Sequence, residues 1–165
     1  MKLMLSGAVM LLCTMAGRTF AARNARRARL LAEFMDALQM LRVHMLDRLM
    51  PLSAALIRSQ SPVLRDMGQD IDSAGAAAAW QKFKAREMKR GGRLDCLSQR
   101  DAQVLDELFG VLGGSGRSEQ KQVIDAAIRE LGILEAAARA ESGEKSKLYT
   151  TLGALAGAAA VIGMI

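Results

Sequence analysis

The residues whose types could support catalysis are few and scattered along the chain. The single histidine, His44, lies among apolar residues of a predicted helix, and the two cysteines, Cys13 and Cys96, are far apart. They form no zinc-ligand pattern, no disulfide framework and no Ser-His-Asp or Cys-His arrangement. Carboxylates such as Asp66 and Asp70 have no histidine near them in sequence, which is typical of a solvated surface. We therefore expect no catalytic, metal-binding or cofactor-binding residues and predict that the protein is not an enzyme.

A glycine-rich segment, Gly113-Gly114-Ser115-Gly116, precedes a predicted helix and has to be considered as a phosphate-binding loop. Such a loop needs a Gly-Lys-Ser/Thr sequence at the start of the helix and a strand before it. Neither is found here. The segment instead predicts a turn between two helices.

A dense cluster of cations could recognise a negatively charged partner. Only Glu87 opposes the charge of Lys82, Lys84, Arg86, Lys89, Arg90 and Arg93. On a continuous helix, five of these residues would share roughly one face: Lys82, Arg86, Lys89, Arg90 and Arg93. Such a face could bind an acidic protein or anionic lipid, and the alternative is a solvated cationic face. We expect no nucleic-acid partner, because Trp80 and Phe83 are the only aromatic residues interleaved with the cluster.

The composition predicts a single all-α domain that carries these residues. The chain has 165 residues, 51% of them hydrophobic, with only 2 prolines and 4% aromatic residues. Abundant Ala, Leu, Met, Arg and Gln favour helices over sheets. No segment alternates between apolar and polar residues with a period of two, so no sheet is expected.

The apolar spacing within residues 23–147 predicts an antiparallel bundle of about six helices. Residues 26–49 form the first, with a near-heptad stripe of Leu31, Phe34, Leu38, Leu41, Met45 and Leu49. Pro51 should end this helix near Met50, and shorter helices are expected over 52–59, 62–72 and 75–90. Ser61 and Ser98 are expected to cap the helices that follow them. Two further helices are predicted from Ser98 to Leu112 and from Ser118 to Glu141, and Gly143 could bend the last one.

The two ends of the chain are almost free of charge and predict transmembrane helices over residues 3–22 and 148–165. Residues 3–17 span about 22 Å as a helix, and extension to Ala22 gives about 30 Å, the thickness of a bilayer core. Residues 148–165 cover about 27 Å, and a buried core helix is the alternative for this segment. Within it, Gly153 and Gly157 form a GxxxG motif, which permits close packing against the first span or against a neighbouring subunit.

The charges that flank the two spans predict their orientation. Arg18, at the end of the first span, is followed by Arg23, Arg26, Arg27 and Arg29, and Lys145 and Lys147 precede the second span. Basic flanks stay on the cytoplasmic side, so the bundle should face the cytoplasm. The alternative is a secreted helical interaction protein, cleaved from a signal peptide after about Ala21 or Ala22. The dense arginine block disfavours this reading, because it resists translocation.

The order of several motifs resembles the stage III sporulation protein AB family over essentially the whole chain. The motifs are a Pro-Leu-Ser turn at residues 51–53 and a Leu-Gly-x-Ser hinge formed by Leu112, Gly113 and Ser115, ahead of Gln120. The most specific motif is the terminal Lys-Leu-Tyr-x-x-Leu-Gly-x-x-x-Gly, at residues 147–157.

The resemblance implies a helical domain similar to the cytoplasmic domains of the F-type platform protein of type II secretion machines. It further implies a platform in the mother-cell membrane, part of the channel-like complex that links mother cell and forespore. The implied partners are the ATPase-like AA protein and other members of the same set. By this resemblance we expect the chain to dock a cytoplasmic ATPase, and self-association stays open.

Overall fold

The computed structural model describes the backbone of residues 2–59, 61–114 and 116–162, and the side chains of 22–59, 61–114 and 116–143. All the regular elements in these ranges are helices, as the composition predicts. The chain divides into two compact units. The first comprises Met1–Ala28 and Ala136–Ile165, and the second is Arg29–Glu135.

Six α-helices and one short π-helix follow one another along the described chain. They are α1 (Lys2–Arg42), the π-helix η1 (Val43–Asp47), α2 (Leu52–Ile57), α3 (Pro62–Ala74), α4 (Ala76–Glu87), α5 (Gln99–Val111) and α6 (Arg117–Ile162). The prediction of an all-helical chain with about six helices is therefore confirmed.

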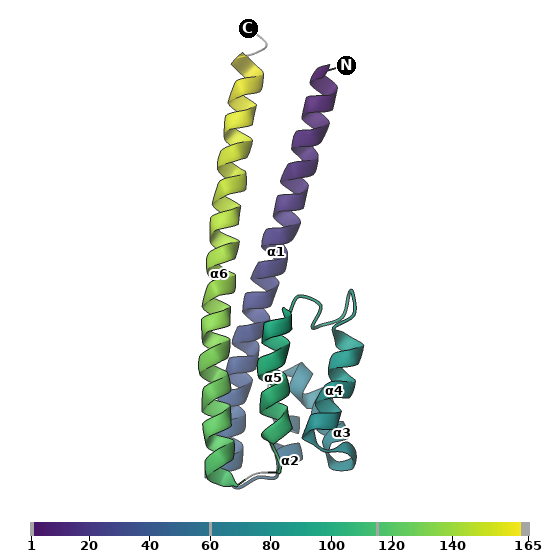
Figure 1. The fold of residues 1–165 in the computed structure, drawn as a ribbon, viewed down its shortest axis with the longest axis vertical. Coiled ribbons are helices and arrows are strands. Elements are labelled where there is room, and N and C mark those ends of the chain that lie inside the picture. Colours follow the sequence, from purple (N-terminus) through teal and green to yellow (C-terminus); the bar gives the residue numbers. More distant parts are fainter. Residues whose placement is uncertain (1, 60, 115, 163–165) are drawn as a thin grey trace. The chain divides into compact units, whose positions relative to one another are not determined.

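Within the second unit, α1 and α6 lie side by side and run in opposite directions (Figure 1). The Arg42 guanidinium of α1 pairs with the Asp125 carboxylate of α6 at 2.9 Å. Further along, Gly132 of α6 faces the Met35 side chain, whose Cε would lie 3.5 Å from a Cβ at that glycine. Two contacts with the same antiparallel spacing fix the register of the pair.

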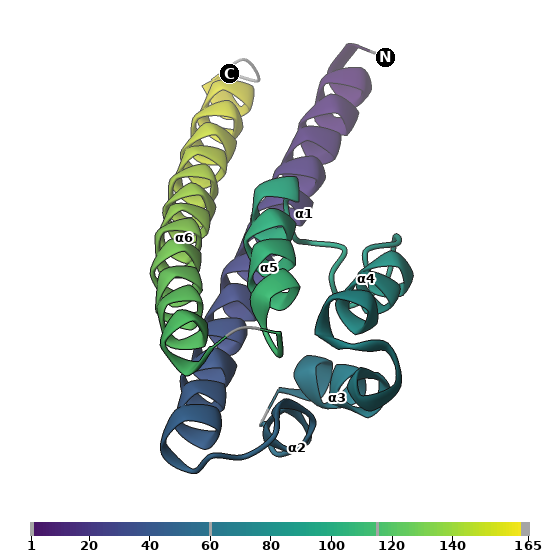
Figure 2. The ribbon, with the colours of Figure 1, turned by 60° about the horizontal axis from the view of Figure 1, so that its bottom comes forward.

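The remaining helices of this unit pack in chain order, α2 on α3, α3 on α4 and α4 on α5 (Figure 2). Their apolar faces and those of α1 and α6 form one core. The side chains predicted at the core of α5 are all buried, namely Leu105, Leu108, Phe109 and Leu112. On α6, Ile124, Leu131 and Leu134 are buried as well, and Ile128 is partly buried against the core.

The end of α1 differs from the prediction of one regular helix to about Met50. The α-helix stops at Arg42 and widens into η1, in which Met45 is still buried. Leu49 then adopts a positive φ of 56° and leaves 62% of its surface exposed, so its assignment to the core stripe is wrong. The reversal of direction before Pro51 explains this, because the residue before a proline cannot continue a helix easily.

One of the two predicted serine caps is present and the other is replaced. The Ser98 hydroxyl accepts a hydrogen bond from the Asp101 backbone, and the Asp101 carboxylate accepts one from the Ser98 backbone at 2.8 Å, a reciprocal capping box. Ser61 makes no side-chain cap to α3. Its hydroxyl donates instead to Glu33 of α1 at 2.8 Å, which ties the α2–α3 connection to α1.

The terminal segments predicted as membrane spans lie within α1 and α6, whose backbones are helical over Lys2–Arg42 and Arg117–Ile162. The side chains of residues 3–21 and 148–165, with Gly153 and Gly157 among them, lie outside the described residues. Among the residues that are described, no helix combines the length and the apolar character needed to cross a bilayer. In the first unit, the Asn24 amide donates to the Glu141 carboxylate at 3.0 Å. No break interrupts α6 at Gly143.

The close approach of α2 and α3 predicts a large effect of one methyl group. A Cβ at Gly68 would lie 3.1 Å from Leu56 Cβ and 3.2 Å from the Ile57 backbone nitrogen. We expect Gly68→Ala to destabilise the chain by about 1–3 kcal/mol, because neither neighbour can move without shifting a helix. Urea unfolding of the full-length chain, followed by fluorescence of its single tryptophan, measures this change.

The matched control is Gly110→Ala on α5, where a Cβ would meet nothing within 4 Å. There we expect stabilisation by about 0.5–1 kcal/mol from the higher helix propensity of alanine. Equal effects at the two glycines would contradict the close packing of α2 on α3.

Candidate partner-binding surface

The position of α4, which carries the first residues of the predicted cation stripe, is set by Trp80. The indole is fully buried and stacks on Phe109 of α5 with 5.1 Å between the ring centroids. Its Nε1 donates to the Asp106 carboxylate of α5 at 2.6 Å, which satisfies the only polar atom of the side chain. Trp80 therefore fixes how α4 lies on α5.

Asp106 collects further donors from α4. Lys84 Nζ lies 2.7 Å from both carboxylate oxygens, and Gln81 Nε2 lies 3.1 Å from Oδ1. This makes Lys84 a partner of α5, and its charge is neutralised within the domain. Lys84 is therefore not one of the cations of α4 that are exposed to solvent.

The cation stripe does not lie on one helical face, because α4 ends at Glu87. The chain then turns through Gly91, whose φ is +88°, and through Gly92. A Cβ at Gly92 would lie only 2.1 Å from the Glu87 carbonyl oxygen, so this turn requires glycine there. The same carbonyl oxygen accepts a hydrogen bond from the Leu94 backbone at 3.1 Å. Lys89, Arg90 and Arg93 therefore lie in a turn after the helix, and the prediction that they share one helical face with Lys82 and Arg86 is wrong.

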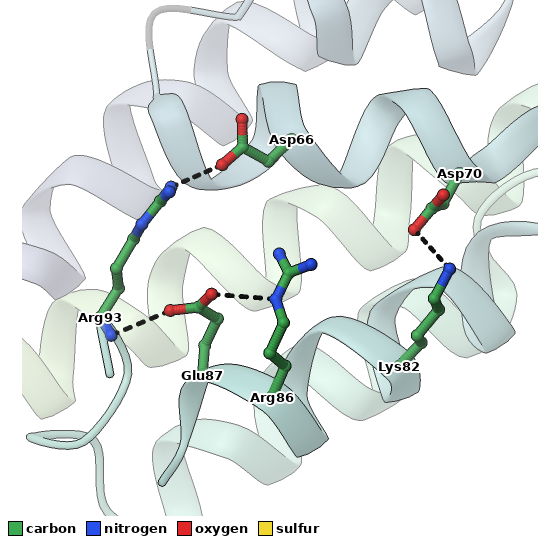
Figure 3. Close-up of polar contacts among 6 residues, drawn as sticks. All are labelled: Asp66, Asp70, Lys82, Arg86, Glu87 and Arg93. Carbon is green, nitrogen blue, oxygen red and sulfur yellow. Dashed lines mark hydrogen bonds and ion pairs between the residues drawn. The ribbon is translucent and has the colours of Figure 1, made fainter. Parts of the chain in front are cut away.

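Two of the five stripe residues are paired with carboxylates of α3 (Figure 3). Lys82 Nζ lies 3.1 Å from Asp70 Oδ2, and the Arg93 guanidinium lies 2.7 Å from Asp66 Oδ2. Asp66 and Asp70 are four residues apart on α3, so they share one face of that helix. The two pairs connect α3 to both ends of the cationic segment.

Glu87 organises the end of α4 (Figure 3). Its carboxylate accepts hydrogen bonds from the Arg93 backbone N–H and from Arg86 Nε, both at 3.1 Å. The Arg93 backbone N–H is the main cause that lowers the pKa of Glu87 below its ordinary value of 4.5. The Arg86 guanidinium also lies 5.3 Å from the centre of the Phe83 ring, a cation–π distance.

Lys89 and Arg90 are both exposed, and in the described part of the chain no hydrogen bond or ion pair holds their side chains. We call these two residues the basic turn. Of the five predicted cations, they are the pair whose charge no carboxylate of the described domain neutralises. An incoming anionic group would meet these two charges without having to break an internal ion pair.

Sequence reasoning missed the partners of the cations. Asp66 and Asp70 look like ordinary surface carboxylates, although their spacing of four residues is that of one helix face. Only the packing of α3 on α4 indicates that this face meets Lys82 and Arg93. Asp106, the partner of Trp80, carries no local signal at all, because it lies 26 residues away in sequence.

The other residues considered for chemistry lie apart from one another. His44 is in η1, with its Nδ1 buried and without a hydrogen-bond partner, and Cys96 is buried and belongs to no disulfide of the described residues. Gly113 has a φ of +90° after α5, in the turn that the glycine-rich segment predicts. Across the described residues, no group of His, Cys, Asp and Glu side chains could hold a metal ion.

Comparison with protein families supplies the identity that the site alone does not. The family model described as stage III sporulation protein AB matches residues 2–165. The chain belongs to the stage III sporulation protein AB family. The resemblance drawn from the sequence motifs is confirmed, and the chain is a member of a family of sporulation proteins. Searches of curated proteins and of solved structures found no match.

The lowered pKa of Glu87 predicts a pH-dependent contribution to stability. A carboxylate whose pKa is lowered by folding stabilises the fold above its unfolded pKa, and this contribution is lost as the pH falls through the folded value. We expect Glu87→Gln to destabilise the full-length chain by about 1 kcal/mol at pH 7. The difference from the parent chain should shrink as the pH falls below about 4.5. Urea unfolding across this pH range measures the effect.

The control for this prediction is Glu107→Gln, an exposed carboxylate on α5. It should change the stability little at either pH. A destabilisation by Glu87→Gln that persisted undiminished at pH 3 would show that the charge of Glu87 is not what stabilises the turn.

Proposed function

We propose that the chain is a non-enzymatic platform component of the mother cell–forespore channel, a secretion-like complex needed for endospore formation. In this proposal two terminal helices anchor it in the cell membrane, and the bundle between them docks a cytoplasmic ATPase on the mother-cell side. The observation that carries the proposal is helix continuity. Each of the two terminal segments, which are almost free of charge, belongs to the same helix as a residue of the bundle core, Leu31 in α1 and Leu131 in α6.

The charge distribution supports the proposed orientation. The arginines that follow the first charge-free segment, Arg23, Arg26 and Arg29, are exposed on α1. Such residues keep a flank on the cytoplasmic side of a membrane. With both flanks basic, the bundle between them would face the cytoplasm, where an ATPase can reach it.

The bundle itself supports a docking role rather than a catalytic one. Several of its polar side chains form helix-to-helix contacts, among them Asp106 with Trp80 and Glu33 with Ser61. The basic turn is the candidate binding site for a partner. Lys89 and Arg90 are exposed, and they lie in a turn whose backbone approaches Glu87 so closely at Gly92 that glycine is required there. The occupant that the family resemblance suggests is the ATPase-like AA protein of the same set, and charge complementarity with the basic turn would require an acidic surface on that protein.

Membrane anchoring is tested by extraction of native membranes with alkaline carbonate. We expect the intact chain, starting at Met1 by mass spectrometry, to stay in the pellet, because two terminal helices of about 18–20 mostly apolar residues hold it in the bilayer. Release of the intact chain into the supernatant, or a mature chain that starts after Ala21 or Ala22, would overturn the proposal.

ATPase docking is tested by co-purification of the full-length chain with the AA protein. We expect the double variant Lys89→Glu, Arg90→Glu to weaken binding at least about tenfold, because each reversal places like charges against an acidic partner. Neither side chain has a partner among the described residues to lose, so the fold should be unaffected.

The matched control is Arg117→Glu, Lys121→Glu, which makes the same charge change at exposed positions at the start of α6. It should bind like the parent chain. Lys82→Glu is a poorer probe, since it would also break the ion pair with Asp70. Unchanged binding by the Lys89 and Arg90 double variant would remove the basic turn from the docking surface.

A further inference from the structure

A groove on the outer side of α1 is left open in the second unit. Glu33, Asp36, Met40 and Val43 line it together with Ser61 of the α2–α3 connection, around a volume of about 540 Å³. Met40 and Val43 are 40% and 41% exposed, high values for large apolar side chains. Asp36 is exposed beside them, so the groove combines an apolar floor with negative charge. We call it the α1 groove.

A ridge of the opposite character runs along the outer side of α6. Ala126, Arg129 and Ile133 are exposed and follow one another at spacings of three and four residues, so they share one face of the helix. Ile133 is 70% exposed, the largest value among the exposed large hydrophobic residues described. No hydrogen bond or ion pair among the described residues engages Arg129. We call this face the α6 ridge.

The groove and the ridge lie at the same height of the bundle. Met35 is level with Gly132, and Arg42 is level with Asp125, so Asp36 is level with Leu131. Arg129 is two residues from Leu131, which is about 3 Å along the axis. By the same register, Ala126 is one residue from the level of Met40, and Ile133 is one residue from the level of Glu33. If a second copy lay parallel to the first, its Arg129 would be near the height of Asp36. Its Ile133 side chain would be at the height of the α1 groove.

From this complementarity we infer that the α1 groove binds the α6 ridge of a second copy of this chain, with the two copies parallel. The inference rests on the proposed function, because anchoring in one membrane gives all copies the same orientation and height. Arg129 of one copy then pairs with Asp36 of the next, and Ile133 enters the groove between Glu33 and Ala37. The two surfaces differ, so the contact is head-to-tail and repeats into a ring or a row.

The contact is tested by disulfide cross-linking of two differently tagged full-length copies in native membranes. One copy carries Met40→Cys and the other Ala126→Cys, both in a background with Cys13→Ser and Cys96→Ala. We expect a cross-link between the tags, because the register brings these positions to the same height within reach of a disulfide. The off-register pair Val43→Cys with Ile133→Cys should not react, since the two positions differ by about 13 Å in height. Absence of the first cross-link, or equal yields for both pairs, would overturn the inference.

A charge swap tests the pair itself while leaving the cysteine positions unchanged. Asp36→Arg in the copy that carries Met40→Cys should lower the cross-link yield at least fivefold, and so should Arg129→Glu in the other copy. The two changes together should restore the yield to within twofold of the parent. The control reversals Asp72→Arg and Arg117→Glu, both at exposed positions, should leave it unchanged. Failure of the double reversal to restore the yield would contradict the Arg129–Asp36 pair.

The same membranes separate this inference from the proposed function. A chain that resists carbonate extraction and binds the ATPase, yet gives no cross-link at residues 40 and 126, refutes the second-copy contact alone. A chain that cross-links at these positions but is released by carbonate refutes the membrane platform and supports the contact between copies.

Discussion

The burial of Trp80 is the interaction on which the proposed docking surface depends. Stacking on Phe109 at 5.1 Å and the bond to Asp106 at 2.6 Å hold α4 on α5, and loss of such an aromatic side chain typically costs about 3–5 kcal/mol. The rotation of α4 that this anchoring sets directs Lys82 toward Asp70 and leaves Glu87 beside the turn. An apolar contact in the core thus determines which cations are neutralised and which stay available.

The ion pairs of Lys82 with Asp70 and of Arg93 with Asp66 add little stability, but they reduce the number of cations that are available to a partner. Lys82 and Asp70 are largely solvent-exposed, and such pairs contribute only about 0–1 kcal/mol. Their consequence is electrostatic, since Asp70 neutralises Lys82 on α4 and Asp66 neutralises Arg93 at the turn. A partner that approaches the bundle therefore meets a concentrated charge at Lys89 and Arg90 instead of a long cationic face.

Helix content, the core of α5 and the family were predictable from the sequence because each depends on local spacing or motif order. The capping box at Ser98 was predictable for the same reason. The end of α4 was predicted only approximately, at Arg90 instead of Glu87, because the charge spacing continues past Glu87 while the helix ends there, before the turn through Gly91 and Gly92. The pairing of Asp66 with Arg93 depends on how α3 packs on α4, which is information that no single helix contains.

The basic turn and the α1 groove share no residue, and this separation has a consequence for assembly. If copies join through groove and ridge, every copy still presents its own Lys89 and Arg90. If the partner of the proposed function also has several binding sites, it would bind several basic turns at once, and linked weak contacts of this kind raise the overall affinity well above that of one contact. Each turn can consequently be weak by itself, which fits a surface built from two exposed cations without an apolar anchor.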